Sequence, residues 1–306
     1  MKYYYPHLLG GIVTSANGDL LEFIPGKSSD QQFNALQQKY PDLKFLPESK
    51  IQEIMILLRD QKYFSSFHDA NVLLTKKQIK KSVNEDNLII QTIANISELD
   101  KISNLLSKRL REWHGLYLPE FAKKVSNPEK FTELIVQKSK EELLKELGLR
   151  SEEIMGADLR KEDVEEFRAL AVEVSQLFAL RQKHEQYLER IMKVYCPNLL
   201  ELGGTTISAK LLELGKGLKN MALMPSSTIQ LLGAEKALFR HIKTGSRSPK
   251  YGILFQHPFV QKRKKSEQGK AARILADKLS LCARLDYFKG EFKAPEYAVD
   301  LEKVFA

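Results

Sequence analysis

The sequence has few cysteines: there are two among 306 residues, Cys196 and Cys282, and they lie far apart in dissimilar surroundings. Neither has a His or another Cys at the spacing of metal ligands, so the sequence indicates neither a disulfide framework nor a zinc site. We expect both thiols to be reduced core residues of a cytosolic protein.

Long apolar runs are also missing. No stretch reaches the roughly eighteen consecutive apolar residues that a membrane span needs, and residues 1–6, MKYYYP, lack the apolar region and small-residue cleavage site of a signal peptide. The sequence therefore argues against membrane insertion and secretion, and we expect a cytoplasmic protein without a membrane partner.

Catalytic and nucleotide-binding motifs are absent as well. Lys243–Gly245 matches the K-T-G of serine β-lactamase-like enzymes, but the S-x-x-K that this chemistry needs occurs nowhere. The glycines of 203–204 and 215–217 form neither a dinucleotide fingerprint nor a Walker loop. His241 and His257 have no identifiable acid partner for general acid–base catalysis. We expect no enzyme, and no cofactor or metal bound by this chain.

Positive charge is abundant and unevenly distributed. The chain has 48 Lys and Arg against 39 Asp and Glu, a net charge of +9. Residues 233–289 hold fourteen cations and four acids, so this segment alone contributes 14 − 4 = +10. A charge asymmetry of this kind is typical of a nucleic-acid-binding face, although a solvated basic surface is the alternative.

The pattern predicts an α+β protein that is mostly α, in three parts. Residues 1–85 read as a small α/β domain: two apolar segments flank Asn17-Gly18, which suits a hairpin turn. Leu43–Leu46 predicts a further strand, and the spacing of Ile51, Ile54, Met55 and Leu58 predicts a short helix. Without a catalytic constellation, this part reads as a binding module.

Residues 86–195 have the period of long amphipathic helices. One apolar stripe comprises Ile89, Ile93, Ile96, Leu99, Ile102, Leu106, Leu110, Trp113, Tyr117 and Phe121, and a second comprises Val164, Phe167, Ala171, Val174, Phe178, Leu188, Ile191 and Tyr195. Together they predict an antiparallel coiled-coil hairpin with an inserted tip that includes Pro128 and shorter helical pieces such as 131–147. Arg181, His184 and Glu185 interrupt the second stripe, where polar residues fix register. Leftover apolar surface would pair the hairpin with another copy.

Residues 196–306 read as an all-helical domain, with helices expected over 205–218, 226–242 and 266–288. Gly233 is costly inside a helix, so it predicts a close backbone approach or a break between two short helices. Lys236, Arg240 and Lys243 recur at i, i+4 and i+7 as a positive stripe. The following loop, 243–252, offers amides, hydroxyls and cations to phosphates together.

This last part contains a series of short motifs: GAEKALFRH at 233–241, KTG at 243–245, PK at 249–250, Gly252, FQHP at 255–258, GK at 269–270 and ARLDYF at 283–288. In their order and spacing these motifs resemble the Nop domain of the archaeal scaffold protein of box C/D guide ribonucleoproteins. WHG at 113–115 with Pro119-Glu120 is similar to the family's signature at the end of the first coiled-coil helix. Ser248 and Tyr251 depart from the family, which often has Pro and His there.

The resemblance implies a non-catalytic scaffold. In the family, the Nop domain binds kink-turn RNA jointly with a small kink-turn-binding protein, the coiled coil forms a homodimer, and the N-terminal domain holds fibrillarin. Fibrillarin, not the scaffold, uses S-adenosylmethionine to methylate ribose 2′-hydroxyls of RNA chosen by guide pairing. The family's eukaryotic members are nucleolar and have long Lys-rich tails; the end of this chain at Ala306 favours an archaeal or minimal form.

We expect the RNA-binding residues to be Lys236, Arg240, His241, Lys243, Arg247, Lys250, Tyr251, Gln256, Arg263 and Lys264. The cations would contact phosphates, and Tyr251 and Gln256 bases or riboses. Two alternatives stay open: a spliceosomal-type Nop-domain protein, against which the Asn17-Gly18 hairpin argues, and a general nucleic-acid binder with no enzyme partner.

Overall fold

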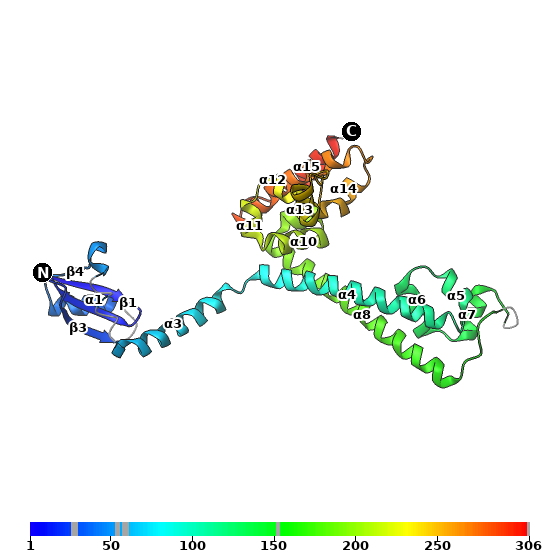
Figure 1. The fold of residues 1–306 in the computed structure, drawn as a ribbon, viewed down its shortest axis with the longest axis horizontal. Helices are drawn as coiled ribbons and strands as arrows, with labels where there is room; N and C mark the ends of the chain where they lie inside the picture. The colour runs from blue at the N-terminus through cyan, green and yellow to red at the C-terminus, as the bar shows by residue number, and fades with distance from the viewer. Residues whose placement is uncertain (26–29, 53–55, 57–60, 151–153, 305–306) are drawn as a thin grey trace. The chain divides into compact units, whose positions relative to one another are not determined.

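The computed structural model describes residues 1–25, 30–52, 56, 61–150 and 154–304 (Figure 1). The chain is mostly helical with one small sheet, as predicted. Its contacts divide it into two compact units, Met1–Val83 and Asn84–Ala306, which are described separately below. None of the helices within the described residues is both long and apolar enough to span a bilayer.

The first unit is built on a four-stranded sheet with the order β3-β2-β1-β4. Its strands are β1 (Lys2–His7), β2 (Gly10–Ser15), β3 (Leu20–Pro25) and β4 (Leu43–Phe45), and its helices are α1 (Asp30–Lys39), the 3-10 turn η1 (Glu48–Lys50) and α3 (Gln61–Ser82). β2 pairs antiparallel with β1 and β3, whereas β4 pairs parallel with β1.

The sequence predicted the hairpin and the fourth strand of this unit. Gly18, at φ 92°, makes the turn between β2 and β3 that the Asn-Gly pair indicated, and β4 coincides with the expected strand at Leu43–Leu46. Tyr4, Val13, Leu36 and Leu43 form its small core. The helix expected over Ile51–Leu58 falls largely outside the described residues. The 22-residue helix α3 was not predicted.

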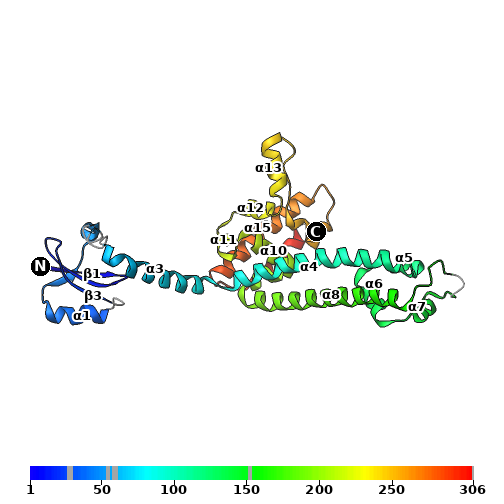
Figure 2. The ribbon, with the colours of Figure 1, turned by 60° about the horizontal axis from the view of Figure 1, so that its bottom comes forward.

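The second unit contains the predicted helical hairpin. The long helices α4 (Glu85–His114) and α8 (Lys161–Tyr195) lie side by side, and α5 (Pro119–Lys124), α6 (Pro128–Gln137) and α7 (Lys140–Leu147) form the tip (Figures 1 and 2). The tip has a core of its own, which includes Phe121, Phe131 and Phe167.

Two details of the predicted first stripe were wrong. The helix ends at His114 instead of continuing to Phe121, because Gly115 caps it and Pro119, which fits only the first turn of a helix, begins α5. Midway along α4 the buried positions are Ser103 and Ser107, while Ile102 is 47% exposed. The face of α4 that is buried here therefore carries small serines, and Ile102 lies on the exposed side of the helix.

Polar pairs join α4 and α8 where the second apolar stripe is interrupted. The Nε of Arg181 donates to Asp100 on α4, and its Nη1 donates to Glu185 at 3.0 Å. Nδ2 of Asn95 lies 2.8 Å from Nδ1 of His184, at hydrogen-bond distance. These directional contacts fix the register of the hairpin.

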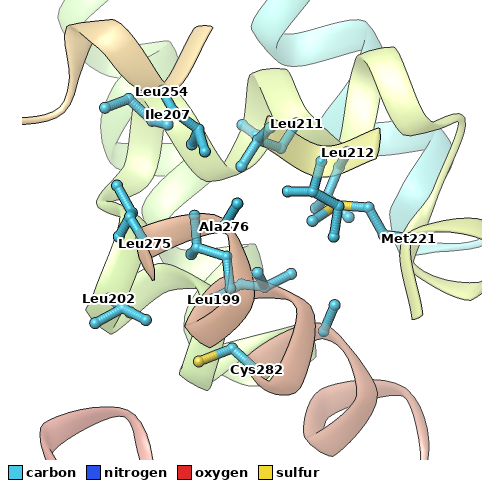
Figure 3. Packing of buried hydrophobic residues seen from close by; sticks show 14 of the residues in the cluster. Leu199, Leu202, Ile207, Leu211, Leu212, Met221, Leu254, Leu275, Ala276 and Cys282 are labelled. Carbon is cyan, nitrogen blue, oxygen red and sulfur yellow. The ribbon is translucent and has the colours of Figure 1, made fainter. Parts of the chain in front are cut away.

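The helical domain completes the second unit. Its elements are α9 (Pro197–Gly203), α10 (Thr205–Gly215), α11 (Leu218–Leu223), α12 (Ser226–Leu231), α13 (Glu235–Thr244), η3 (Ile253–Gln256), α14 (Pro258–Gln261), α15 (Gln268–Tyr287) and α16 (Ala294–Lys303). Figure 3 shows its core, in which Leu275, Ala276 and Cys282 of α15 face Leu199, Leu202, Leu211 and Leu212.

This core continues into the base of the hairpin. Ile89 and Ile93 of α4 and Leu188 and Met192 of α8 belong to the same buried cluster as the helices of the domain. Asp86 adds a polar link, because its Oδ1 accepts a hydrogen bond from the backbone N–H of Leu218 at 2.9 Å. The base of the hairpin and the helical domain therefore share one hydrophobic core.

Candidate nucleic-acid interface

Helix α13 carries the predicted positive stripe. Lys236, Arg240 and Lys243 are all exposed, and none of the ten residues of α13 is buried. Figure 2 shows α13 standing out from the other helices of its domain. Among the described residues, no carboxylate lies within ion-pair distance of these three cations. The stripe is therefore free to meet an anion.

Gly233 sets the direction in which α13 leaves the domain. Its φ of +86° breaks the helix expected over 226–242 into α12 and α13, and a Cβ at this position would lie 3.3 Å from the backbone nitrogen of Ile253. Both predicted reasons for this glycine, the break and the close approach, are confirmed. Its N–H donates to Oε1 of Glu235 at 2.7 Å, which orients the first turn of α13.

The loop that follows α13 is held at both ends. The Nδ1 of His241 donates to the carbonyl of Ser246. Farther on, the N–H of Gly252 donates to the carbonyl of Gln230 at 2.9 Å, and the N–H of Ile253 to that of Leu232 at 2.8 Å. Arg247 and Lys250 are exposed on this loop. Because hydrogen bonds hold both ends of the loop, the cationic groups of Arg247 and Lys250 are attached to an ordered backbone.

Tyr251 and Phe255 form a stacked pair after the loop. Their ring centroids lie 5.0 Å apart at 11°, and the Tyr251 hydroxyl donates to Oε1 of Gln268 at 3.1 Å. Phe255 is 40% exposed and the neighbouring Gln256 is exposed. Phe255 was not among the predicted RNA-binding residues, although it belongs to the FQHP motif.

Gln268 brings several predicted residues together at the start of α15. It accepts from Tyr251, and its Nε2 donates to the carbonyl of Arg263 at 3.4 Å. Lys250 packs there too, because a Cβ on Gly269 would lie 3.3 Å from its Cδ. The loop that the His241–Ser246 hydrogen bond closes connects α13 to these residues around Gln268.

Arg263 and Lys264 differ although they are neighbours. Lys264 is exposed, whereas Arg263 is half-buried, lies over the Phe259 ring at 5.2 Å and donates to Glu302 at 3.4 Å. The charge of Arg263 is therefore partly compensated within the protein.

The remaining candidate groups have structural roles. His257 accepts at Nδ1 from the N–H of Phe259 at 3.2 Å and donates from Nε2 to the carbonyl of Leu202 at 3.1 Å, and burial lowers its pKa. Cys196 and Cys282 are fully buried, and burial raises the pKa of Cys282 to about 12. In the described part of the chain, no three His, Cys, Asp or Glu side chains cluster as metal ligands would.

Comparisons with known proteins identify the family of this chain. The family model for Nop, described as "snoRNA binding domain, fibrillarin", matches residues 95–303. A NOP5 family protein of Methanocaldococcus jannaschii is 39% identical over 251 residues, which are 77% of this chain and 60% of that protein. Nucleolar protein 56 of Caenorhabditis elegans is 32% identical over 86% of this chain and 61% of its own length. Nucleolar protein 58 of Schizosaccharomyces pombe is 31% identical over 91% of this chain and 62% of its own length.

The chain thus spans about three fifths of the length of these relatives. A solved structure of a fibrillarin/Nop5p complex aligns with 98% of the chain, at a TM-score of 0.45 and 22% identity. The family model covers more than half of the chain and includes the whole of α13, the loop after it and α15. The chain belongs to the Nop family.

Proposed function

We propose that this chain is the non-catalytic scaffold of a box C/D small ribonucleoprotein. It binds a kink-turn guide RNA together with a small kink-turn-binding protein, and it positions fibrillarin for guide-directed 2′-O-methylation of ribose in RNA. Fibrillarin binds S-adenosylmethionine and carries out the methyl transfer. Family membership supports the RNA and fibrillarin as partners, since the family model names both a snoRNA and fibrillarin.

The observation that carries this proposal is the exposed stripe on α13. A ten-residue helix with no buried residue contributes nothing to the core, and an isolated helix of this length is marginal in water. Its sequence nevertheless places Lys236, Arg240 and Lys243 on one side without compensating acids. Binding to a polyanion accounts for both features, because phosphates would neutralise the stripe and hold the helix.

The other predicted residues extend this interface. Arg247, Lys250 and Lys264 would add phosphate contacts from ordered backbone, and His241 would hold the loop that presents them. Gln256 and the stacked ring of Tyr251 are available for bases or riboses, while Arg263 would contribute less because Glu302 already pairs with it. Base pairing with the guide RNA selects the target sequence, so the protein itself needs mainly to recognise RNA shape and to contact phosphates.

The remaining parts would place the partners. In this proposal residues 1–85 hold fibrillarin, residues 86–195 form a homodimer through the coiled coil, and residues 196–306 bind RNA. Exposed apolar side chains on the hairpin support the homodimer: Ile102, Leu105 and Leu180 are 47%, 68% and 40% exposed. The particle would be cytoplasmic in an archaeal cell and nucleolar in a eukaryotic one, as the nucleolar names of two relatives suggest.

Reconstitution tests the proposal. A box C/D RNA, a kink-turn-binding protein and fibrillarin are combined with and without this chain, and ribose methylation of a complementary target is scored. We expect methylation only in the complete mixture. RNA binding without fibrillarin recruitment would instead support a spliceosomal-type Nop protein or a general nucleic-acid binder, and methylation by this chain alone would contradict the scaffold assignment.

A further inference from the structure

Helix α3 of the first unit carries a cluster of positive charge. Four of its lysines fall within six residues, and all four are exposed: Lys76, Lys77, Lys80 and Lys81. Among the described residues, no carboxylate lies within ion-pair distance of any of them. The acidic residue of α3 is Asp69, about two turns before the cluster, and its carboxylate contacts His68 at 3.3 Å. Within the described part of the first unit, the charge of the cluster is therefore uncompensated.

The spacing of these lysines is unfavourable for a helix on its own. They form two pairs that are four residues apart, and like charges at this spacing repel each other and destabilise a helix. The partial negative charge at the C-terminal end of α3 favours Lys80 and Lys81 in the last turn, but it falls off before Lys76 and Lys77. A bound polyanion would remove this repulsion.

The lysines and the apolar residues of α3 lie on opposite sides of the helix. A hollow of 370 Å³ on the apolar side is lined by Phe64, Phe67, His68, Asn71, Val72, Thr75 and Lys76. At about 100° per residue, the other three lysines of the cluster fall on the side opposite to His68 and Thr75, and none of them lines the hollow. These three residues, the lysine face, are Lys77, Lys80 and Lys81. A ligand on the lysine face would leave the apolar side free for another contact.

The composition of the lysine face favours a nucleic acid over an acidic protein. In the last two turns of α3 this side has no aromatic or large apolar residue, since Ile79 falls on the apolar side. Protein interfaces are centred on aromatic and apolar anchors, and lysine is depleted from them. Binding to a phosphate backbone needs cations and no apolar anchor. RNA phosphates therefore match this face.

The apolar side of α3 does not suit a membrane surface. His68, Asn71 and Thr75 lie among its apolar residues, and their polar groups would lose hydrogen bonds in the hydrocarbon of a bilayer. If α3 lay on a bilayer by this side, the lysine face would point away from the headgroups into water. The opposite arrangement of the two sides thus favours RNA over anionic lipid as the polyanion.

We propose that the lysine face of α3 is a second RNA-binding surface, which contacts RNA phosphates independently of base sequence. The inference rests on the proposed function, which makes RNA the polyanion of the particle. It goes beyond that function by assigning RNA contacts to the first unit, whereas the predicted RNA-binding residues all lie in the second. The unit proposed to hold fibrillarin would then contact the RNA as well.

The first test measures the affinity of the full chain for a box C/D RNA bound to its kink-turn protein, by filter binding from low to high salt. Lys77→Glu with Lys81→Glu reverses two charges of the lysine face. The matched control is Lys123→Glu with Lys124→Glu, since both lysines are exposed on α5 and the net charge changes equally. Each phosphate contact contributes roughly 0.7–0.9 to the slope of log affinity against log salt, so the lysine-face variant should have a slope about 1.5 lower than the control. We expect its affinity at low salt to be at least fivefold weaker than that of the control.

A conservative variant separates charge from folding. Lys77→Arg with Lys81→Arg keeps both charges and should bind the RNA as the wild type does, because phosphate contacts require the positive charge. Circular dichroism checks that the helix content of each variant is retained. Weak binding by the arginine variant, with its helix content intact, would contradict a role of these positions as phosphate contacts.

A crosslinking test identifies the partner directly and changes one residue at a time. Lys77→Cys on the lysine face and Thr75→Cys on the apolar side each provide one reactive thiol, since Cys196 and Cys282 are fully buried. Each variant is labelled with benzophenone and irradiated in the complex with RNA, the kink-turn protein and fibrillarin. We expect crosslinks to RNA from position 77 and none from position 75.

Several results overturn the inference. If the lysine-face variant and its control have the same affinity and salt slope while wild type binds the RNA, α3 makes no phosphate contacts and the proposed function stands. Crosslinks from position 77 to fibrillarin alone would assign the lysine face to an acidic protein surface. Binding to phosphatidylserine vesicles that the lysine-face variant abolishes, with RNA affinity unchanged, would assign it to lipid. Failure of wild type to bind the RNA would contradict both the proposed function and this inference.

Discussion

The carboxylate of Asp286 accepts hydrogen bonds from both nitrogens of Asn198, the backbone N–H at 3.1 Å and the side-chain amide at 2.9 Å. A third bond comes from the N–H of Leu199 at 2.9 Å. The amide oxygen of Asn198 in turn accepts from the backbone N–H groups of Lys293 and Ala294. One buried pair thus joins the start of α9 to the end of α15 and the start of α16.

Replacement of Asp286 should strongly destabilise the helical domain. Asp286→Ala leaves three donors without their acceptor in a site that is 4% exposed, and since each buried donor left unsatisfied costs about 1–3 kcal/mol, the loss should be about 3 kcal/mol or more. Urea unfolding measures the loss. The matched control is Asp300→Ala, which breaks an exposed ion pair with Lys278 and should cost less than about 1 kcal/mol. Similar losses for both variants would contradict the structural role of the Asp286–Asn198 pair.

Gly252 should tolerate no side chain. A Cβ there would lie 1.9 Å from the carbonyl oxygen of Leu232, so Gly252→Ala must displace the backbone on which Tyr251 and Phe255 depend. We expect a loss of roughly 1–3 kcal/mol in unfolding free energy, as for overpacked sites, together with weaker RNA binding. Gly245→Ala is the control: its φ is +67°, but nothing lies within 4 Å of a Cβ there.

The Gly245 control should lose only about 1 kcal/mol, the cost of a left-handed residue with a side chain. Equilibrium unfolding and RNA affinity are measured for both variants. If Gly252→Ala lost less unfolding free energy than Gly245→Ala, the close approach of Gly252 to Leu232 would not constrain this segment.

The buried imidazole of His114 should make the stability of the second unit depend on pH. His114 is 2% exposed among Phe121, Phe131 and Phe167 at the hairpin tip, and burial lowers its pKa to about 4. The unfolded state therefore binds a proton at higher pH than the folded state. The contribution of the neutral His114 ring to stability is fully present above its unfolded pKa of about 6.5. This contribution is lost as the pH falls towards the folded pKa of about 4.

The shift corresponds to about 3 kcal/mol across this interval. His114→Phe, which cannot be protonated, should flatten the pH dependence of urea unfolding by about that amount between pH 7 and pH 4. His257, whose pKa burial also lowers, contributes in the same direction in both proteins and cancels in the difference. An unchanged pH profile in the variant would show that His114 is accessible to protons in the folded state.

The sequence predicted most of the fold because its strongest signals are local. Asn17-Gly18, the two helical stripes and Gly233 each act through backbone preferences or periodicity within a few turns, and the elements they predicted are present. The end of α4 was misplaced because apolar spacing continues through Tyr117 and Phe121, although Gly115 and Pro119 end the helix. Burial of Ser103 in place of Ile102 depends on how closely α8 approaches, which no local pattern records.

The sequence predicted the charged residues of the candidate interface, but it did not predict which of them already have partners within the protein. Spacing placed Lys236, Arg240 and Lys243 on one stripe, and the structure leaves all three exposed. Neighbours in the sequence gave no sign that Arg263 meets Glu302, thirty-nine residues away, or that Gln268 holds Tyr251. Such pairings depend on the tertiary packing of α15 and α16.

The α13 stripe provides the most direct test of RNA binding. Lys236→Glu with Arg240→Glu reverses two exposed charges without touching the core, so the fold should be retained. Each phosphate contact contributes roughly 0.7–0.9 to the slope of log affinity against log salt, so loss of two contacts should lower the slope by about 1.5. We expect at least a tenfold loss of affinity for a box C/D RNA bound to its kink-turn protein, measured by filter binding from low to high salt.

The control is Lys219→Glu, an exposed lysine on α11 outside the interface. This change lowers the net charge of the same domain, so it reports the effect of overall charge alone. A salt slope that is the same in the α13 variant and in the control would show that the stripe is solvated surface. A fall of about 1.5 in the α13 variant, with the control near wild type, would identify Lys236 and Arg240 as phosphate contacts, because a loss of general electrostatic attraction would also lower the slope of the control, which carries half the charge change of the α13 variant.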